Sequence, residues 1–117
     1  MTNFVSQAFC SAISLGYSPE SPEAWEPLAT LVLEGAYEAA LLAAVADRVE
    51  REGTGIVWLT KLGGGAFDNK LAWIVGGMAH GLRRVADRAL DVRVAHYLEL
   101  DQEFVDALAA AGVSAEV

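Results

Sequence analysis

Three short apolar runs alternate with long stretches of helical periodicity, and this order restricts the fold more than any other feature. The runs are Phe4 to Ile13, Ile56 to Thr60 and Val92 to Leu98. Each is separated from the next by enough residues for a helical crossover and too many for a hairpin. We therefore expect parallel strands joined by right-handed crossovers. Small and apolar residues at alternate positions of the first run indicate a strand covered on both faces.

The stretches between and after these runs predict three helices. Apolar residues recur at spacings of three and four from Ala24 to Arg51, which is typical of an amphipathic helix. A second helix is expected from Leu71 to Ala89 and a third from Gln102 to Ala111, with Asp101 as its N-cap. Three glycines lie inside the second helix, at Gly76, Gly77 and Gly81. Each costs about 1 kcal/mol relative to alanine, so we expect close approach to the sheet or to a neighbouring helix.

The order strand, helix, strand, helix, strand, helix predicts an α/β fold with three layers, a mainly parallel sheet flanked by helices. The 117 residues suffice for one domain with a hydrophobic core. The net charge of −8 argues against sequence-independent binding of nucleic acid and against docking on an anionic membrane.

The cysteine count and the charge distribution suggest a cytoplasmic protein. Cys10 is the single cysteine, so no intrachain disulfide can form. The first basic residue is Arg48, so the amino terminus lacks the positive region of a secretory signal. The uncharged stretch from Leu71 to Leu82 is too short to span a bilayer, and we expect no membrane crossing.

The segment TKLGGGAFDNK, which follows the second run, is the main candidate for a ligand site. Ligands of open parallel sheets bind beyond the carboxyl ends of the strands. The consecutive glycines Gly63, Gly64 and Gly65 would let backbone N–H groups approach an anion at the start of the next helix. The two lysines of the chain, Lys61 and Lys70, flank this loop. The alternative is a tight strand-to-helix turn with solvated lysines.

Three further residues of this loop have two interpretations each. Asn69 is expected to be the N-cap of the following helix. Asp68 either caps the helix or, beside a phosphate, bonds a sugar hydroxyl or orients a water molecule. Phe67 either packs in the core or forms a platform for a ribose.

Other chemically capable residues form weaker candidates. Glu34 and Glu38 share one helix face, which a solvated surface explains more simply than an acid/base pair. Cys10, His80 and His96 are weak candidates for a nucleophile with its base. No common metal or catalytic motif occurs, so we expect neither a metal nor a cofactor.

Several strings together resemble one family. FCSA at 9–12, YEA at 37–39 and LTKLGGGAFDN at 59–69, followed by Trp73 and Ile74, resemble the carboxyl-terminal half of a macro domain. The resemblance is closest to macro-like ADP-ribosylhydrolases related to poly(ADP-ribose) glycohydrolases. It covers roughly Phe4 to Leu108, and the glycine loop is its most specific part.

The resemblance implies that the chain binds ADP-ribose or an ADP-ribosyl group. Residues 62–69 would wrap the diphosphate, including Ala66, and Phe67 would lie against the distal ribose. Tyr97 and Leu98 would lie near the adenosine. Asp68 stands where the family commonly has glycine, so no role can be transferred to it. It is nevertheless the one local carboxylate that could orient water if the assembled protein is a hydrolase.

The amino-terminal half of a macro domain has no counterpart in these 117 residues. In macro domains a strand from that half lies between the strands that resemble 4–13 and 56–60. The resemblance therefore implies a gap in the sheet, and unpaired strand edges favour association. We expect a single macro-like domain over residues 1–117 that is completed by a second copy or by a complementary chain. The alternative function is a non-catalytic module for assembly.

Overall fold

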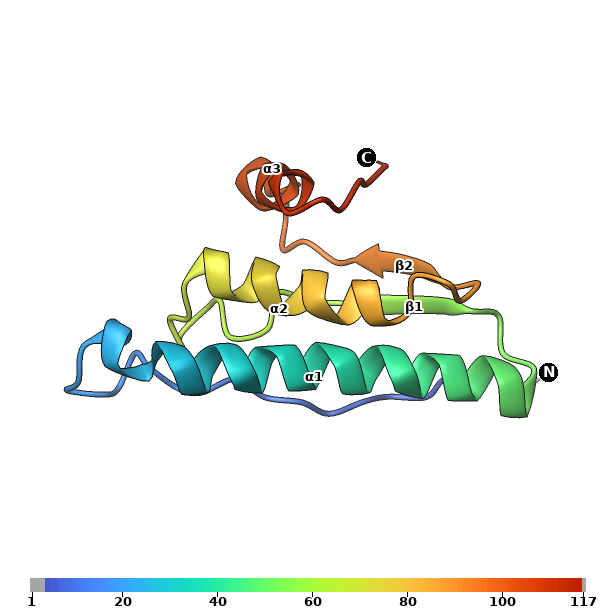
Figure 1. The fold of residues 1–117 in the computed structure, drawn as a ribbon, viewed down its shortest axis with the longest axis horizontal. Helices are drawn as coiled ribbons and strands as arrows, with labels where there is room; N and C mark the ends of the chain where they lie inside the picture. The colour runs from blue at the N-terminus through green and yellow to red at the C-terminus, as the bar shows by residue number, and fades with distance from the viewer. Residues whose placement is uncertain (1–3, 117) are drawn as a thin grey trace.

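The computed structural model describes residues 4–116 and contains three helices and two strands (Figure 1). Their order along the chain is α1 (Pro22–Arg51), β1 (Ile56–Leu59), α2 (Leu71–Arg84), β2 (Asp91–Val94) and α3 (Gln102–Ala110). From residue 22 onward, this order of helices and strands confirms the one expected from the sequence. The first expected strand is absent from the described residues.

The prediction of a three-layer α/β fold with a mainly parallel sheet is wrong. The described residues form one parallel two-stranded sheet, in which Ile56 lies opposite Asp91 and Leu59 opposite Val94. On one sheet face, Ile56 and Trp58 are 43% and 62% exposed. Val57 and Leu59, on the other face, pack with the core. The protein is thus mostly helical, with a small sheet that is covered on one face.

The segment 4–13 runs beside α1 without joining the sheet (Figure 1). The hydroxyl of Ser6 donates to the Asp47 carboxylate at 3.1 Å, and the thiol of Cys10 lies 3.9 Å from the carbonyl oxygen of Ala36. Phe4 and Phe9 are both 89% exposed, so the segment buries little apolar surface of its own. The alternation of residue types gave no information on whether a partner strand was present.

The core lies mainly between α1 and α2. Four residues of α1 at spacings of four are buried there, namely Ala29, Leu33, Tyr37 and Leu41. A Cβ atom on Gly77 of α2 would lie 2.9 Å from Leu33 Cβ, and one on Gly81 would lie 3.1 Å from Glu38 N. The expected close approach of the second helix is therefore confirmed at these two glycines, and the neighbour is α1. Gly76, by contrast, meets nothing within 4 Å.

The helix ends differ in part from the expected ones. α1 begins at Pro22, where the missing N–H is of no consequence in a first turn. α2 ends at Arg84, five residues before the expected end at Ala89. α3 has the expected cap, because Asp101 accepts a hydrogen bond from the Phe104 N–H at 3.1 Å.

By length and composition, α1 is also a candidate membrane span. The core helix of a soluble protein passes the same test, and one face of α1 packs on α2 here. The expectation that no segment crosses a membrane thus remains a prediction.

Candidate functional site

The glycine loop and the loop after β2 meet at one edge of the sheet, beyond the carboxyl ends of β1 and β2. The Lys61 ammonium joins them by donating to the Asp101 carboxylate at 2.5 Å. His96 strengthens the second loop by accepting from the Asp101 N–H at 3.2 Å, with its ring edge-on to Phe104. Parallel pairing of β1 with β2 places both loops at this edge.

Tyr37 of α1 fixes the start of the glycine loop. Its hydroxyl donates to the carbonyl oxygen of Thr60 at 2.5 Å and accepts from the N–H of Leu62 at 2.9 Å. The side chain is 3% exposed, and burial raises the pKa of Tyr37 to about 12, against a smaller lowering by the Leu62 N–H. The phenol therefore stays neutral and serves as both donor and acceptor.

Asn69 closes the other end of the loop, and the prediction that it is the helix N-cap is wrong. Its side-chain amide donates to the carbonyl oxygens of Ile13 at 2.8 Å, Gly63 at 3.3 Å and Phe67 at 3.4 Å. Lys70 occupies the N-cap position of α2 and makes no capping bond with its side chain. The buried Asn69 side chain thus ties Ile13 to the loop instead of capping the helix.

One polar atom of Asn69 has no partner. The side chain is 6% exposed, and its Oδ1 accepts no hydrogen bond within residues 4–116. A buried acceptor without a donor is uncommon in folded proteins and is often found where a ligand or ordered water binds.

The backbone of the loop explains which of its residues must be small. Gly63 has φ of 79°, and a Cβ there would lie 2.5 Å from that of Ala12. Asp68 has φ of 56°, a left-handed conformation that favours glycine and that aspartate tolerates better than most residues. Gly65 has no such restriction, because a Cβ would meet nothing within 4 Å. The protein's own packing therefore does not require glycine at Gly65.

Three successive backbone amides at the tip of the loop are available to a ligand. The N–H groups of Gly65, Ala66 and Phe67 form no hydrogen bond with any part of the chain that the structure describes. All three residues are exposed. Adjacent free N–H groups near the N-terminus of a helix are the usual means of holding a phosphate through the backbone.

Both lysines that flank the loop are engaged by carboxylates. Lys61 binds Asp101, and Lys70 donates to Glu23 at 2.8 Å. The hydrogen bonds from these lysines lower the pKa of Asp101 and the pKa of Glu23. Their charges are thus largely compensated, and the backbone amides provide the main attraction for an anion.

The remaining predicted site residues lie in the glycine loop, except Tyr97, which follows β2. Phe67 is 37% exposed and Tyr97, on the neighbouring loop, is 86% exposed, so both rings are accessible. Asp68 is exposed, and its carboxylate makes no ion pair within residues 4–116. Gly64 lies in ordinary contact with Ile74, 3.5 Å from its would-be Cβ. Phe67 and Asp68 thus both lie exposed in the loop, next to the predicted glycines.

The weaker candidates do not form a second site. Glu38 binds Arg84 at 2.6 Å and His80 at 3.5 Å, whereas His96 accepts from a backbone amide. Cys10 has no histidine partner among the described residues. Within residues 4–116, no group of three or more potential metal ligands occurs.

Tyr37 is the residue of the site that sequence reasoning missed. It occurs within the YEA string, yet its periodicity with Leu33 and Leu41 indicates only a core position. A tyrosine on a buried helix face usually has a partner for its hydroxyl, and this is the signal that could have identified it.

Comparisons with protein-family models, with curated proteins and with solved structures found no match.

Proposed function

We propose that the chain recognises ADP-ribose, or an ADP-ribosyl group, at the glycine loop. The observation that carries the proposal is the row of free N–H groups at Gly65, Ala66 and Phe67, on a loop whose ends are fixed by Tyr37 and Asn69. A fixed loop presents its amides without the entropy cost of ordering them on binding. The choice of ADP-ribose as the ligand rests on the resemblance of the sequence strings around this loop to macro-like ADP-ribosylhydrolases.

The parts of such a ligand match the groups around the loop. A diphosphate suits the free amides, and a ribose can stack on the exposed ring of Phe67. Tyr97 offers a second exposed ring for the adenine. Because the charges of both lysines are paired with carboxylates, the site would bind a diphosphate through its backbone amides without attracting anions in general.

Hydrolysis of an ADP-ribosyl group is proposed only for the completed assembly, with Asp68 orienting the water. The left-handed backbone at Asp68 decides which variant tests this. Alanine would add backbone strain, whereas asparagine tolerates the conformation and removes the charge. Asp68→Asn should abolish deribosylation while leaving ADP-ribose binding intact, and unchanged turnover would exclude Asp68 as the catalytic group.

Calorimetric titration with ADP-ribose tests the binding proposal. Gly65→Ala should fold normally, since a methyl group meets nothing within 4 Å, yet it should block close approach of the diphosphate. Gly35→Ala is the matched control, because Gly35 on α1 also meets nothing and lies outside the loop. Binding that is lost in Gly65→Ala and kept in Gly35→Ala supports the proposal. If titration of the wild type with ADP-ribose gives no heat, even after a completing partner chain has been added, the binding proposal is contradicted.

A second candidate function, assembly with another chain or a second copy, has a separate observation in its favour. The protein exposes 7910 Å², whereas a compact monomer of 12.4 kDa exposes roughly 6,100 Å². The excess of roughly 1,800 Å² is larger than one partner's share of a standard interface, about 800 Å². The radius of gyration of 14.8 Å likewise exceeds the roughly 13.4 Å of a compact domain of 117 residues.

The exposed sheet is the natural place for such a partner. Trp58 is 62% exposed on β1, with the Arg93 guanidinium over its ring, and tryptophan is among the residue types enriched at the centres of interfaces. Light scattering with Trp58→Ala tests this candidate. A wild-type oligomer that dissociates in the variant supports it. A wild-type monomer that melts cooperatively contradicts self-association.

A further inference from the structure

One face of α1 is apolar and uncovered, although another face of the same helix forms the core. Leu31 is 63% exposed and Val49 is 71% exposed on this face, and Leu28 and Leu42 are exposed as well. At 3.6 residues per turn, these side chains lie opposite the four buried residues of α1. A helix with apolar residues on two opposite faces is typical of one that is buried on both. Recognition of ADP-ribose at the glycine loop makes no use of this face.

The apolar residues of this face follow a period of seven. Leu28, Gly35, Leu42 and Val49 succeed one another at intervals of seven, and Leu31 lies between the first two. These five residues are called the outer stripe of α1 below. A period of seven keeps one face of a helix turned towards a second helix with the same period. A second copy of the chain carries the same stripe.

Gly35 lies at the centre of the outer stripe. It is exposed, and a Cβ there would meet nothing within 4 Å, so the packing of the chain does not require glycine. Glycine inside a helix lowers stability, and close approach of another backbone is a common reason for it. Leu28 and Leu42 lie seven residues before and seven residues after Gly35. The stripe therefore matches itself about a two-fold axis that passes through Gly35.

We propose that two copies of the chain associate through the outer stripes of α1, with the two helices antiparallel and crossing at Gly35. Leu28 then contacts Leu42 of the partner subunit, as a two-fold axis requires. The glycines let the backbones approach closely at the crossing, and the leucines fill the space on either side. The antiparallel arrangement also places the positive end of each helix dipole beside the negative end of the other.

The outer stripe is large enough for a weak and specific dimer. At a rise of 1.5 Å per residue, the 30 residues of α1 extend for about 45 Å, close to the 49 Å length of the molecule (Figure 1). A third of the surface of a cylinder of that length and about 11 Å in diameter is about 500 Å². Two copies would thus bury about 1,000 Å², the area at which specific interfaces begin. The dimer should therefore exist in a concentration-dependent equilibrium with the monomer.

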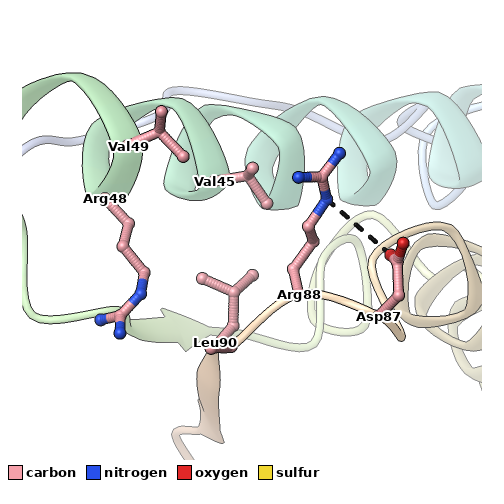
Figure 2. A pocket seen from close by; sticks show the side chains of 7 residues that line it. Val45, Arg48, Val49, Asp87, Arg88 and Leu90 are labelled. Carbon is pink, nitrogen blue, oxygen red and sulfur yellow. Dashed lines mark ion pairs between the residues drawn. The ribbon is translucent and has the colours of Figure 1, made fainter.

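Neighbouring parts of the chain leave the outer stripe open. The segment 4–13 also runs along α1 (Figure 1), yet the leucines and the valine of the stripe remain exposed. At the carboxyl-terminal end of the helix, Figure 2 shows Arg48 extending away from Val49. Nη1 of Arg48 donates there to the carbonyl oxygen of Thr54 at 2.9 Å. This guanidinium group is thus held outside the stripe.

A second helix suits the outer stripe better than a lipid bilayer does. Helices that lie on membranes carry lysine and arginine along their polar face, whereas α1 has no basic residue before Arg48. Two carboxylates, those of Glu34 and Glu38, lie near the middle of α1. A membrane span would place both of them in the hydrocarbon, where charges are rare and costly.

Sedimentation velocity of the full chain over about a hundredfold range of concentration tests the proposal. The wild type should pass from monomer to dimer as concentration rises. Gly35→Glu places two like charges against each other at the crossing and should raise the dimer dissociation constant at least about tenfold, as should Gly35→Lys. An equimolar mixture of these two variants should associate more strongly than either variant alone, because opposite charges then face each other.

Controls separate the dimer from the folding of the monomer and from the sheet. Both Gly35 variants should melt at least as high as the wild-type monomer, since the added side chains meet open space and favour helix more than glycine does. Gly76→Glu is the matched control, because Gly76 of α2 is also exposed with nothing within 4 Å, and it should dimerise as the wild type does. Trp58→Ala should leave the contact at α1 intact.

Three results would overturn the proposal. The first is a wild type that stays monomeric at every concentration, whether or not it binds phosphatidylcholine vesicles. The second is a Gly35→Glu dimer as stable as that of the wild type. The third is an equimolar mixture of Gly35→Glu and Gly35→Lys that associates no more strongly than either variant alone.

Discussion

Replacement of glycines in α2 tests the packing of the two long helices most sharply, because two neighbouring positions have opposite expectations. A Cβ at Gly77 would lie 2.9 Å from Leu33 Cβ and 3.0 Å from the Leu33 carbonyl carbon. A Cβ at Gly76 would meet nothing within 4 Å. Both substitutions gain the same helix propensity, about 1 kcal/mol per glycine replaced by alanine. The difference between the two variants therefore isolates the contact between the helices.

The expected magnitudes follow from these contacts. Gly76→Ala should raise the free energy of unfolding by up to about 1 kcal/mol. Gly77→Ala forces the helices apart at the backbone, and overpacking of this kind costs about 1 to 3 kcal/mol, which offsets or exceeds the gain. Gly77→Ala should thus be about 1 to 3 kcal/mol less stable than Gly76→Ala. For a chain of this size, that is a difference in Tm of about 4 to 12 °C.

Urea unfolding followed by circular dichroism measures both free energies, and equal m-values would show that the variants expose the same surface on unfolding. Gly81→Ala is a second test of the same interface, since its Cβ would lie 3.1 Å from the Glu38 nitrogen. If Gly77→Ala proves as stabilising as Gly76→Ala, α1 and α2 do not pack as closely as described.

Three further predictions concern the glycine loop. Tyr37→Phe leaves the Thr60 carbonyl and the Leu62 N–H without their partner and should lower the free energy of unfolding by about 1 to 3 kcal/mol. The pKa of Tyr37 is raised from 10.0 to about 12 in the folded state. The contribution of the neutral phenol to the free energy of unfolding should therefore be fully present below pH 10 and fall as pH rises towards 12. Tyr37→Phe should remove that part of the fall. Asn69→Ala should speed amide hydrogen exchange at Leu15 and Gly16, whose N–H groups donate to the Phe67 carbonyl oxygen, more than in α3, and uniform exchange rates would contradict its role as a tie. Asp68→Gly should be neutral or stabilising in thermal melts while Asp68→Ala is destabilising by about 1 kcal/mol, and the reverse order would exclude the left-handed conformation.

The helices and the place of the loop could be predicted because their signals are local. Periodicity over residues 24–51 marks one face of α1, and the run IVWL followed by glycines marks a strand that ends in a loop. The strand at 4–13 could not be assessed in this way. Whether an apolar run joins a sheet depends on a partner strand, and the described residues supply none for it.

The side-chain partners within the site depend on tertiary contacts that no local pattern contains. Lys61 meets Asp101 from 40 residues away, and Lys70 meets Glu23 from 47 residues away. Asn69 has the residue type and position of a helix cap, yet a bond to the Ile13 carbonyl oxygen, 56 residues earlier, turns its side chain inward. Local preference predicted the cap, and packing of the amino-terminal segment overrode it.

We propose that the tip of the glycine loop binds the diphosphate of ADP-ribose. Amide chemical shifts recorded during titration with ADP-ribose test it most directly, because each N–H is observed separately. We predict that the largest shifts occur at Gly65, Ala66 and Phe67, with smaller ones at Tyr97, and that adenosine without the diphosphate leaves the three loop amides unmoved. Saturable shifts centred elsewhere, or no shifts at these amides, would contradict binding at the loop.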